Sequence, residues 1–316
     1  MLHLRVISPP ELSDGVLEVL ETCVGVVNIV VLPGAARSPA GDLVQFDVAR
    51  EAANEVIEYL QRLGLHTEGS IAAEEVDLSL SEVSERAQEE APGDGDDAVV
   101  WAEFAQRVGD DSRLTWAFLA FLMIATQIAA IGVIVNSPIL IVGAMVLGPE
   151  FGAIAAICFG LIRTDRQLIG RALRTLAVGF AVALAITFVC ALAWRWLGWI
   201  DSGSLRTGHE EIEFIVKPDR WSFIVALLAG AAGVLSVTAG KSSALVGVFI
   251  SVTTVPAAGY FAVAAALSRW GDMGASAVQL GVNIAGMIIS GVLTLLVQRA
   301  YWSRFGMRLP VSPGRR

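Results

Sequence analysis

Cysteine and histidine are scarce in this sequence, which has three of each among its 316 residues. Cys23, Cys158 and Cys190 lie far apart, without the short spacing of metal-binding or redox pairs, and two of them fall in apolar segments. We interpret all three as small buried hydrophobes, and we expect neither a metal nor a cofactor. No His, Cys or carboxylate pair recurs at catalytic spacing within an apolar segment, which argues against an enzyme.

Basic charge is also missing from the first third of the chain. Residues 1–112 contain 6 Lys and Arg against 23 Asp and Glu, a net charge of −17. This region has no glycine-rich phosphate loop and no aromatic platform for RNA, and a nucleic-acid surface requires a basic patch, so we expect no nucleic-acid partner. Residues 1–25 lack the basic start and continuous apolar core of a cleavable signal, so the N-terminus is expected in the cytoplasm.

Apolar sequence is abundant, and it is concentrated after Leu114. Hydrophobic residues make up 55% of the chain, and residues 113–316 carry 16 Lys and Arg against 8 Asp and Glu, a net charge of +8. These contrasts predict an acidic soluble domain followed by a membrane domain. We divide the chain into a soluble domain (1–80), an acidic linker with an amphipathic helix (81–112), a membrane domain (113–300) and a basic cytoplasmic tail (301–316).

The soluble domain shows the order strand, helix, strand, strand, helix, strand, which is the split βαβ arrangement of ferredoxin-like domains. Ser8 and Glu11 have the spacing of a capping box at the start of the first helix. Residues 33–41 are rich in turn-forming residues and predict a loop. The predicted fold class is therefore a membrane α-helical bundle with an N-terminal α+β ferredoxin-like domain. That domain could sense a small molecule or pair subunits, and we assign no site to it.

Six apolar segments are long enough to cross a bilayer, which takes about 20 residues. They cover residues 114–135, 137–162, 168–197, 221–239, 242–267 and 275–297. Six crossings place both termini on one side, and twelve basic residues then fall on that side against five on the other. This asymmetry predicts a multi-pass protein of the inner or plasma membrane, with the bilayer as a partner and both termini in the cytoplasm.

The second segment, NSPILIVGAMVLGPEFGAIAAICFGLIR (136–163), carries Pro149 and Glu150 near its middle. A lipid-facing carboxylate at mid-depth would cost about 2.5–3.5 kcal/mol, so Glu150 is expected to face the bundle interior or an aqueous cavity. One interpretation is a kinked packing helix whose Glu is satisfied by a polar neighbour. The other is a solute or ion site, because transporters use the backbone groups that broken helices free. Flux or binding at such a site should depend on pH.

The fifth segment repeats this pattern, since it begins at Ser242 and is interrupted at Pro256. Each interrupted segment is the middle one of three, which is the arrangement of inverted repeats in transporters. Hydroxyl groups of the fifth segment would then lie opposite Glu150, unless they bond their own backbone. The candidate transport or binding residues are Glu150, Pro149, Gly148, Asn136, Ser251, Thr253, Thr254, Pro256 and Asn283.

Two stretches carry a resemblance to a known family. The run from 111 to 163, with its string SPILIVGAMVLGPEFG, and the segment VQLGVNIAGMIISGVLTLLVQR (278–299) resemble uncharacterised hydrophobic membrane proteins of bacteria and archaea grouped as domain-of-unknown-function family 389. The similarity covers residues from about 110 to 300, and members commonly carry an N-terminal soluble domain. The resemblance implies a shared membrane core. The resemblance does not identify a reaction, and it does not assign a role to Glu150.

Two classes of function remain open. The first is a transporter or channel for a small solute or ion, with the cytoplasmic domain as a regulatory or assembly device. The second is a non-transporting membrane sensor or scaffold. The broken segments and Glu150 favour the first, and the absence of a second charge within the spans favours the second. Small-residue faces in either case predict a homo-oligomer; they include Gly230, Gly233, Gly281, Gly286 and Gly291.

Overall fold

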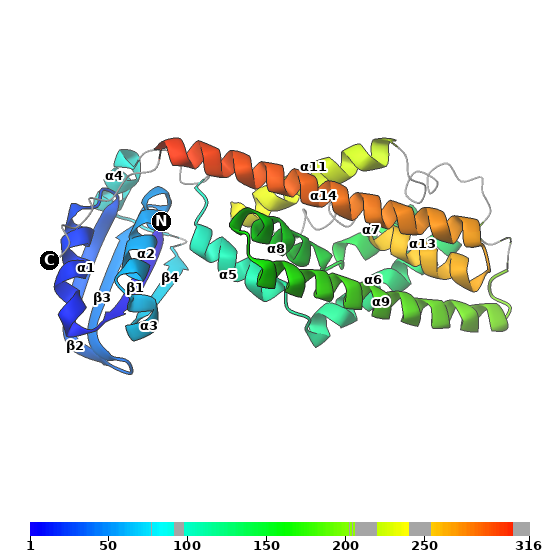
Figure 1. Cartoon of the computed structure of the whole chain (residues 1–316), viewed down its shortest axis with the longest axis horizontal. Helices are drawn as coiled ribbons and strands as arrows, with labels where there is room; N and C mark the ends of the chain where they lie inside the picture. Colours follow the sequence, from blue (N-terminus) through cyan, green and yellow to red (C-terminus); the bar gives the residue numbers. More distant parts are fainter. Residues whose placement is uncertain are drawn as a thin grey trace. The chain divides into compact units, whose positions relative to one another are not determined.

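The computed structural model describes residues 1–76, 78–91, 98–201, 203, 205, 220–239 and 254–305 (Figure 1). The chain divides into two compact units. Unit 1 comprises Met1–Phe104 and Gln298–Arg316, and unit 2 comprises Ala105–Val297. All strands among the described residues belong to unit 1, and the described elements of unit 2 are helices.

Unit 1 is built on a four-stranded antiparallel sheet in the order β2-β3-β1-β4. The strands are β1 (Leu2–Ser8), β2 (Val26–Arg37), β3 (Ala40–Val48) and β4 (Ser70–Glu75), and the helices between them are α1 (Pro10–Thr22), α2 (Arg50–Arg62) and the short α3 (Leu65–Glu68). Alternate residues of β1 are buried, as expected when one face of a sheet meets the core. The helices complete that core with Val16, Leu20, Val56 and Leu60. The predicted order of strands and helices is present.

Two local predictions for this unit are wrong. Ser8 does not cap α1: the N-cap residue is Pro9, and the Ser8 hydroxyl donates instead to the Pro9 carbonyl at 3.1 Å. Ser8 is the last residue of β1 and is paired with Asp42 of β3, so its backbone belongs to the sheet and not to the start of the helix. Residues 33–41 do not form a loop, because β2 continues to Arg37. Register shifts accommodate the irregular sequence, and Pro33 is tolerated because β2 is an edge strand.

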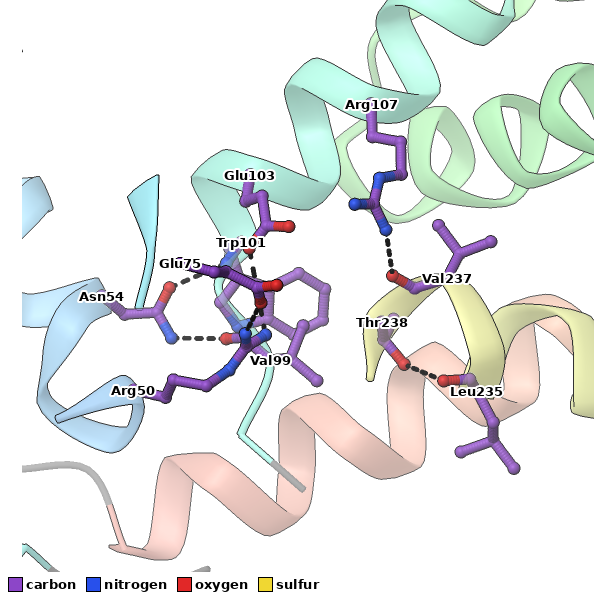
Figure 2. A network of polar contacts seen from close by, with 10 residues as sticks. All are labelled: Arg50, Asn54, Glu75, Val99, Trp101, Glu103, Arg107, Leu235, Val237 and Thr238. Atoms are coloured by element: carbon purple, nitrogen blue, oxygen red, sulfur yellow. Dashed lines mark hydrogen bonds and ion pairs between the residues drawn. The ribbon is translucent and has the colours of Figure 1, made fainter. Parts of the chain in front are cut away.

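The end of unit 1 contains α4 (Glu82–Glu90) and the first residues of α5 (Trp101–Asp111). Asn54 of α2 holds the segment that enters α5, as Figure 2 shows: its amide nitrogen donates to the Val99 carbonyl at 2.6 Å, and its amide oxygen accepts the Trp101 N–H at 2.8 Å. Val100 lies between these bonds and belongs to the core of unit 1. The start of the predicted amphipathic helix is therefore packed against the soluble domain.

Unit 2 contains α6 (Trp116–Ile134), α7 (Pro138–Val146), α8 (Glu150–Arg163), α9 (Arg166–Trp196), α11 (Arg220–Thr238), α13 (Val255–Ala266) and most of α14 (Trp270–Phe305). Within the described residues, four helices are long and apolar enough to cross a membrane, and the bent pair α7–α8 makes a fifth candidate. The 12-residue α13 is too short to cross alone. The first half of the predicted fifth span, residues 242–253, lies outside the described residues.

The helices of unit 2 approach one another through small residues. A Cβ added to Gly259 of α13 would lie 2.8 Å from the backbone nitrogen of Ala130 in α6. Gly286 and Gly230 are likewise used in contacts between α14 and α11. Large apolar side chains are exposed on the outside, among them Ile139 and Leu228. Several apolar helices with this distribution are compatible with a membrane protein, and some of the small residues that predicted self-association serve packing within unit 2.

Candidate functional site

The second apolar segment is broken where the sequence predicts. α7 ends at Val146, α8 begins at Glu150, and the two axes differ by 53°. Pro149 is the N-cap residue of α8, and Gly148 lies within the break. Because Pro149 has no N–H group, it cannot continue the hydrogen-bond ladder of α7, and its fixed φ angle suits the start of a new helix.

The start of α13 is the second half of the candidate site. Thr254 is the N-cap residue of α13, and Pro256 lies in its first turn. Pro256 is therefore a helix-starting proline, as is common at this position. Ser251 and Thr253, which the sequence also offered as candidates, lie outside the described residues.

A hydrogen bond joins these two helix starts. The Thr254 hydroxyl donates to Oε1 of Glu150 at 2.6 Å, and both residues are completely buried. An N-cap threonine usually accepts a bond from its own helix, but Thr254 makes no such bond. The distance falls in the range of short hydrogen bonds from a hydroxyl to a charged carboxylate. Two residues 104 positions apart are thus brought together.

An apolar cluster begins directly after Thr254 in the sequence. It consists of Val255 of α13, Ala125 and Ala129 of α6 and Ala144 of α7. Glu150 occupies the first position of α8, where the partial positive charge of a helix N-terminus stabilises a carboxylate. The arrangement places one acidic side chain at the starts of two helices. Within the described residues there is no group of three or more His, Cys, Asp or Glu that could hold a metal ion.

The two asparagine candidates lie elsewhere. Asn136 adopts a left-handed conformation, with φ of 52°, in the turn between α6 and α7. The nine residues of α7 separate it from the break, a helix length of about 13 Å. The structure therefore does not bring Asn136 to Glu150. Asn283 is completely buried and lies on α14.

Two further buried polar residues of α14 were missed by the sequence analysis. Ser276 and Gln279 are completely buried. The Ser276 hydroxyl and both amide atoms of Gln279 have no hydrogen-bond partner. With Asn283 they are spaced three and four residues apart, which places all three on one helix face. A glutamine four residues before an asparagine within an apolar span is the signal that could have identified them.

Comparison with known proteins places this region in a family. Residues 145–289 match the model of the family described as "Domain of unknown function (DUF389)". The "Uncharacterized protein MJ0678" of Methanocaldococcus jannaschii is 24% identical over 179 residues, which are 57% of this chain and 52% of that protein. The chain therefore matches about half the length of this relative. No solved structure matches the chain. The predicted resemblance to this family is confirmed for residues 145–289, which include Glu150, Thr254, Gln279 and Asn283.

Proposed function

We propose that unit 2 is a membrane transporter or channel for a small solute or ion, whose pathway passes the break between α7 and α8 and the start of α13. The observation that supports this proposal is the buried hydrogen bond between Thr254 and Glu150. Transporters commonly bind their substrates where interrupted helices begin or end inside the bundle. The proposal assigns no catalytic activity to the chain.

Glu150 supplies the chemistry of the proposed site. Its carboxylate can bind a cation or a proton, and the Thr254 hydroxyl can return to capping α13 when a ligand takes its place at Oε1. The exchange replaces one hydrogen bond by a ligand contact at Glu150 and a cap at α13. Such an exchange breaks the hydrogen bond that joins the starts of α8 and α13. Ligand binding can therefore favour a different arrangement of these two helices.

We further propose the six-span topology, with α13 as the outer half of a broken fifth span and both termini in the cytoplasm. The twelve-to-five distribution of basic residues supports this orientation. It is checked by labelling intact cells after placing one cysteine at Trp199 or at Gln167, which are both exposed, in a cysteine-free background. Reaction at position 199 and not at 167 is expected, and the reverse pattern contradicts the topology.

Unit 1 is proposed to be a ferredoxin-like regulatory or assembly domain. Its strand order β2-β3-β1-β4, with helices after β1 and β3, supports this assignment.

Self-association is proposed as well: Gly274 and Gly281 of α14 are seven residues apart and meet nothing within 4 Å, so this face is open to a second copy in the bilayer. Mass measurement of the detergent-solubilised protein tests it, and a monomer at micromolar concentration contradicts it.

Flux in proteoliposomes tests the transport proposal. We expect wild-type vesicles to pass Na⁺, K⁺ or H⁺ faster than protein-free vesicles, with a rate that depends on pH. Glu150→Gln keeps the shape but removes the charge, so it should reduce the flux at least about tenfold and abolish its pH dependence. Thr254→Val should reduce the flux, and Thr254→Ser, which keeps the hydroxyl, should restore it.

The controls separate transport from a structural role. Gln167→Ala alters an exposed polar residue at the start of α9, away from the break, and should leave the flux unchanged. The melting temperatures of all variants are compared. If Glu150 has only a structural role, Glu150→Gln should lower the melting temperature, and stabilisation by an added ligand should be the same as in the wild type. If wild-type vesicles pass no ion and no solute stabilises the protein, the transport proposal fails and a sensor or scaffold takes its place.

A further inference from the structure

The buried face of α14 is polar between Ser276 and Asn283. Ser276, Gln279 and Asn283 are completely buried, whereas Val278 and Ile289 are at least half exposed. This is the reverse of a helix in a water-soluble protein, which turns its apolar side inward. Polar residues on the inner face of a membrane helix mark solute or ion pathways.

The polar face lies between two apolar contacts of the same helix. On one side, Met273 packs against the cluster that includes Val263 and Ala264 of α13. On the other side, Gly286 packs against Ala226 of α11 and Gly291 lies against Cys158 of α8. Figure 1 shows α14 extending past both α13 and α11. The residues from 276 to 283 thus occupy the stretch between two closely packed regions.

Two residues of this stretch, Ser276 and Gln279, do not use their side-chain hydrogen-bonding capacity within the protein. Gln279 has an amide group that can donate two hydrogen bonds and accept two, yet neither its nitrogen nor its oxygen has a partner, and the Ser276 hydroxyl one turn away has none. Buried polar groups in proteins are nearly always paired with protein atoms, water or a ligand. Two neighbouring residues that depart from this rule on one face point to a bound molecule.

The chemistry of the face limits what that molecule is. Residues 276–283, SAVQLGVN, carry no formal charge. A carboxamide presents a donor and an acceptor side by side, which is complementary to another carboxamide or to urea. A Ca²⁺ ion takes about six to eight oxygen ligands, whereas Ser276, Gln279 and Asn283 offer three side-chain oxygens.

We infer that Ser276, Gln279 and Asn283 form a binding face for a small uncharged solute of the amide or urea class. The inference deepens the proposed transport function and rests on it, because the solute must reach the interior of unit 2. Glu150 and Thr254 then form the part of the pathway that responds to charge, and the polar face of α14 forms the part that recognises a neutral group.

The test uses full-length protein in proteoliposomes and follows the uptake of acetamide and of urea by light scattering after rapid mixing. Wild-type vesicles are expected to take up acetamide at least about tenfold faster than protein-free vesicles. Gln279→Met, which is close in size and has no amide, should lower uptake to the protein-free rate. The same variant should raise the melting temperature of the ligand-free protein, since it removes buried polar groups that have no partner.

Gln127→Met makes the same change at a half-buried position of α6 and should leave uptake unchanged. Ser276→Ala is a second variant of the face and should lower uptake as well. The inference is overturned if Gln279→Met and Ser276→Ala behave like the wild type. It is also overturned if wild-type vesicles gain permeability to water but not to acetamide or urea, since the face then holds ordered water only.

Cation flux in the same vesicles separates this inference from the proposed function. If the wild type passes a cation, Glu150→Gln does not, and neither acetamide nor urea enters, the transport proposal stands and the neutral-solute site is wrong. If the wild type passes neither cations nor neutral solutes, both are wrong.

Discussion

Both units of this protein bury apolar side chains, but among the described residues only unit 2 also buries an acidic and an amide side chain completely. In unit 1, large hydrophobic side chains such as Phe46 and Leu60 are completely enclosed. In unit 2, Glu150 and Gln279 are completely enclosed, whereas Ile139 is 84% exposed. The two units thus differ in which side chains they bury and which they expose. The burial of a side chain must therefore be interpreted according to the solvent that surrounds its unit. Water drives large apolar groups inward, whereas lipid would not, so the exposed apolar side chains of unit 2 are compatible with the proposed membrane location.

The way the elements approach each other differs as well. The sheet and helices of unit 1 are separated by side chains that fill the space between them. In unit 2, α13 lies so close to α6 that a glycine is required at the contact. Unit 1 should therefore be sensitive to the loss of side-chain volume, and unit 2 to its gain.

The largest effect is expected from Gly259→Val in unit 2. Its new Cβ would lie 2.8 Å from the backbone nitrogen of Ala130 and 3.0 Å from the Ala129 Cβ. Neither helix can yield without disturbing its neighbours, so overpacking should destabilise the unit by about 3 kcal/mol or more. We expect the variant to lose its monodisperse peak in size-exclusion chromatography or to melt well below the wild type.

Gly170→Val in α9 is the matched control, because Gly170 is exposed and a Cβ there meets nothing within 4 Å. It should melt close to the wild-type temperature. Equal effects of the two substitutions would mean that close helix approach does not explain the packing of unit 2.

The second prediction tests unit 1 by removing volume. Phe46→Ala on β3 empties a site that is completely buried, and such substitutions cost about 3–5 kcal/mol. In the full-length protein, hydrogen exchange at the amides of β1 and β3 should accelerate by at least about 100-fold, while amides of α6 should keep their protection. Val30→Ala, at an exposed position of the edge strand β2, should change exchange little. Matching acceleration in α6 would show that the units do not unfold separately.

The smallest effect concerns two aspartates whose pKa values shift in opposite directions. The Ser13 hydroxyl and the Gly34 amide hold the pKa of Asp42 in unit 1 below its ordinary value. Its stabilising contribution is present above the ordinary pKa and is lost as the pH falls through the lowered value.

In unit 2, desolvation raises the pKa of Asp111, with Arg107 opposing the rise and Asp110 adding to it. Asp111 lies in α5, before the first span.

The raised pKa means that the folded protein binds the Asp111 proton more tightly than the unfolded chain, so stability falls as the pH rises through the shifted range. Asp111→Asn should therefore gain stability relative to the wild type at neutral pH and lose that advantage in acid. Asp42→Asn should be less stable than the wild type at neutral pH and approach it in acid. Local hydrogen exchange in β3 for Asp42 and in α5 for Asp111 measures both, and pH trends of the same sign would contradict the assignment.

The order of elements in unit 1 was predictable because alternation and helical periodicity are local patterns. The length of β2 was not, since Pro33 signals a turn unless the strand is known to lie at an edge. Pro149 predicted the break in the second segment because proline acts on its own helix. The partner of Glu150 was only one of several hydroxyl candidates, and no local pattern distinguishes Thr254 from its neighbours. Gln279 was missed because one amide alone does not reveal the buried side of a helix; only its four-residue spacing from Asn283 indicates a shared face.

The hydrogen bond between Glu150 and Thr254 also sets an order of events during synthesis. Its two residues are separated by 104 positions. At about 5–20 residues per second, the ribosome adds Thr254 roughly 5–20 s after Glu150. During this interval α6 to α9 can form, but the contact to α13 cannot exist. Glu150 therefore has no bond to Thr254 until the second half of the domain has been synthesised. The earliest time at which this bond can form is also the earliest time at which α8 and α13 can be joined by it.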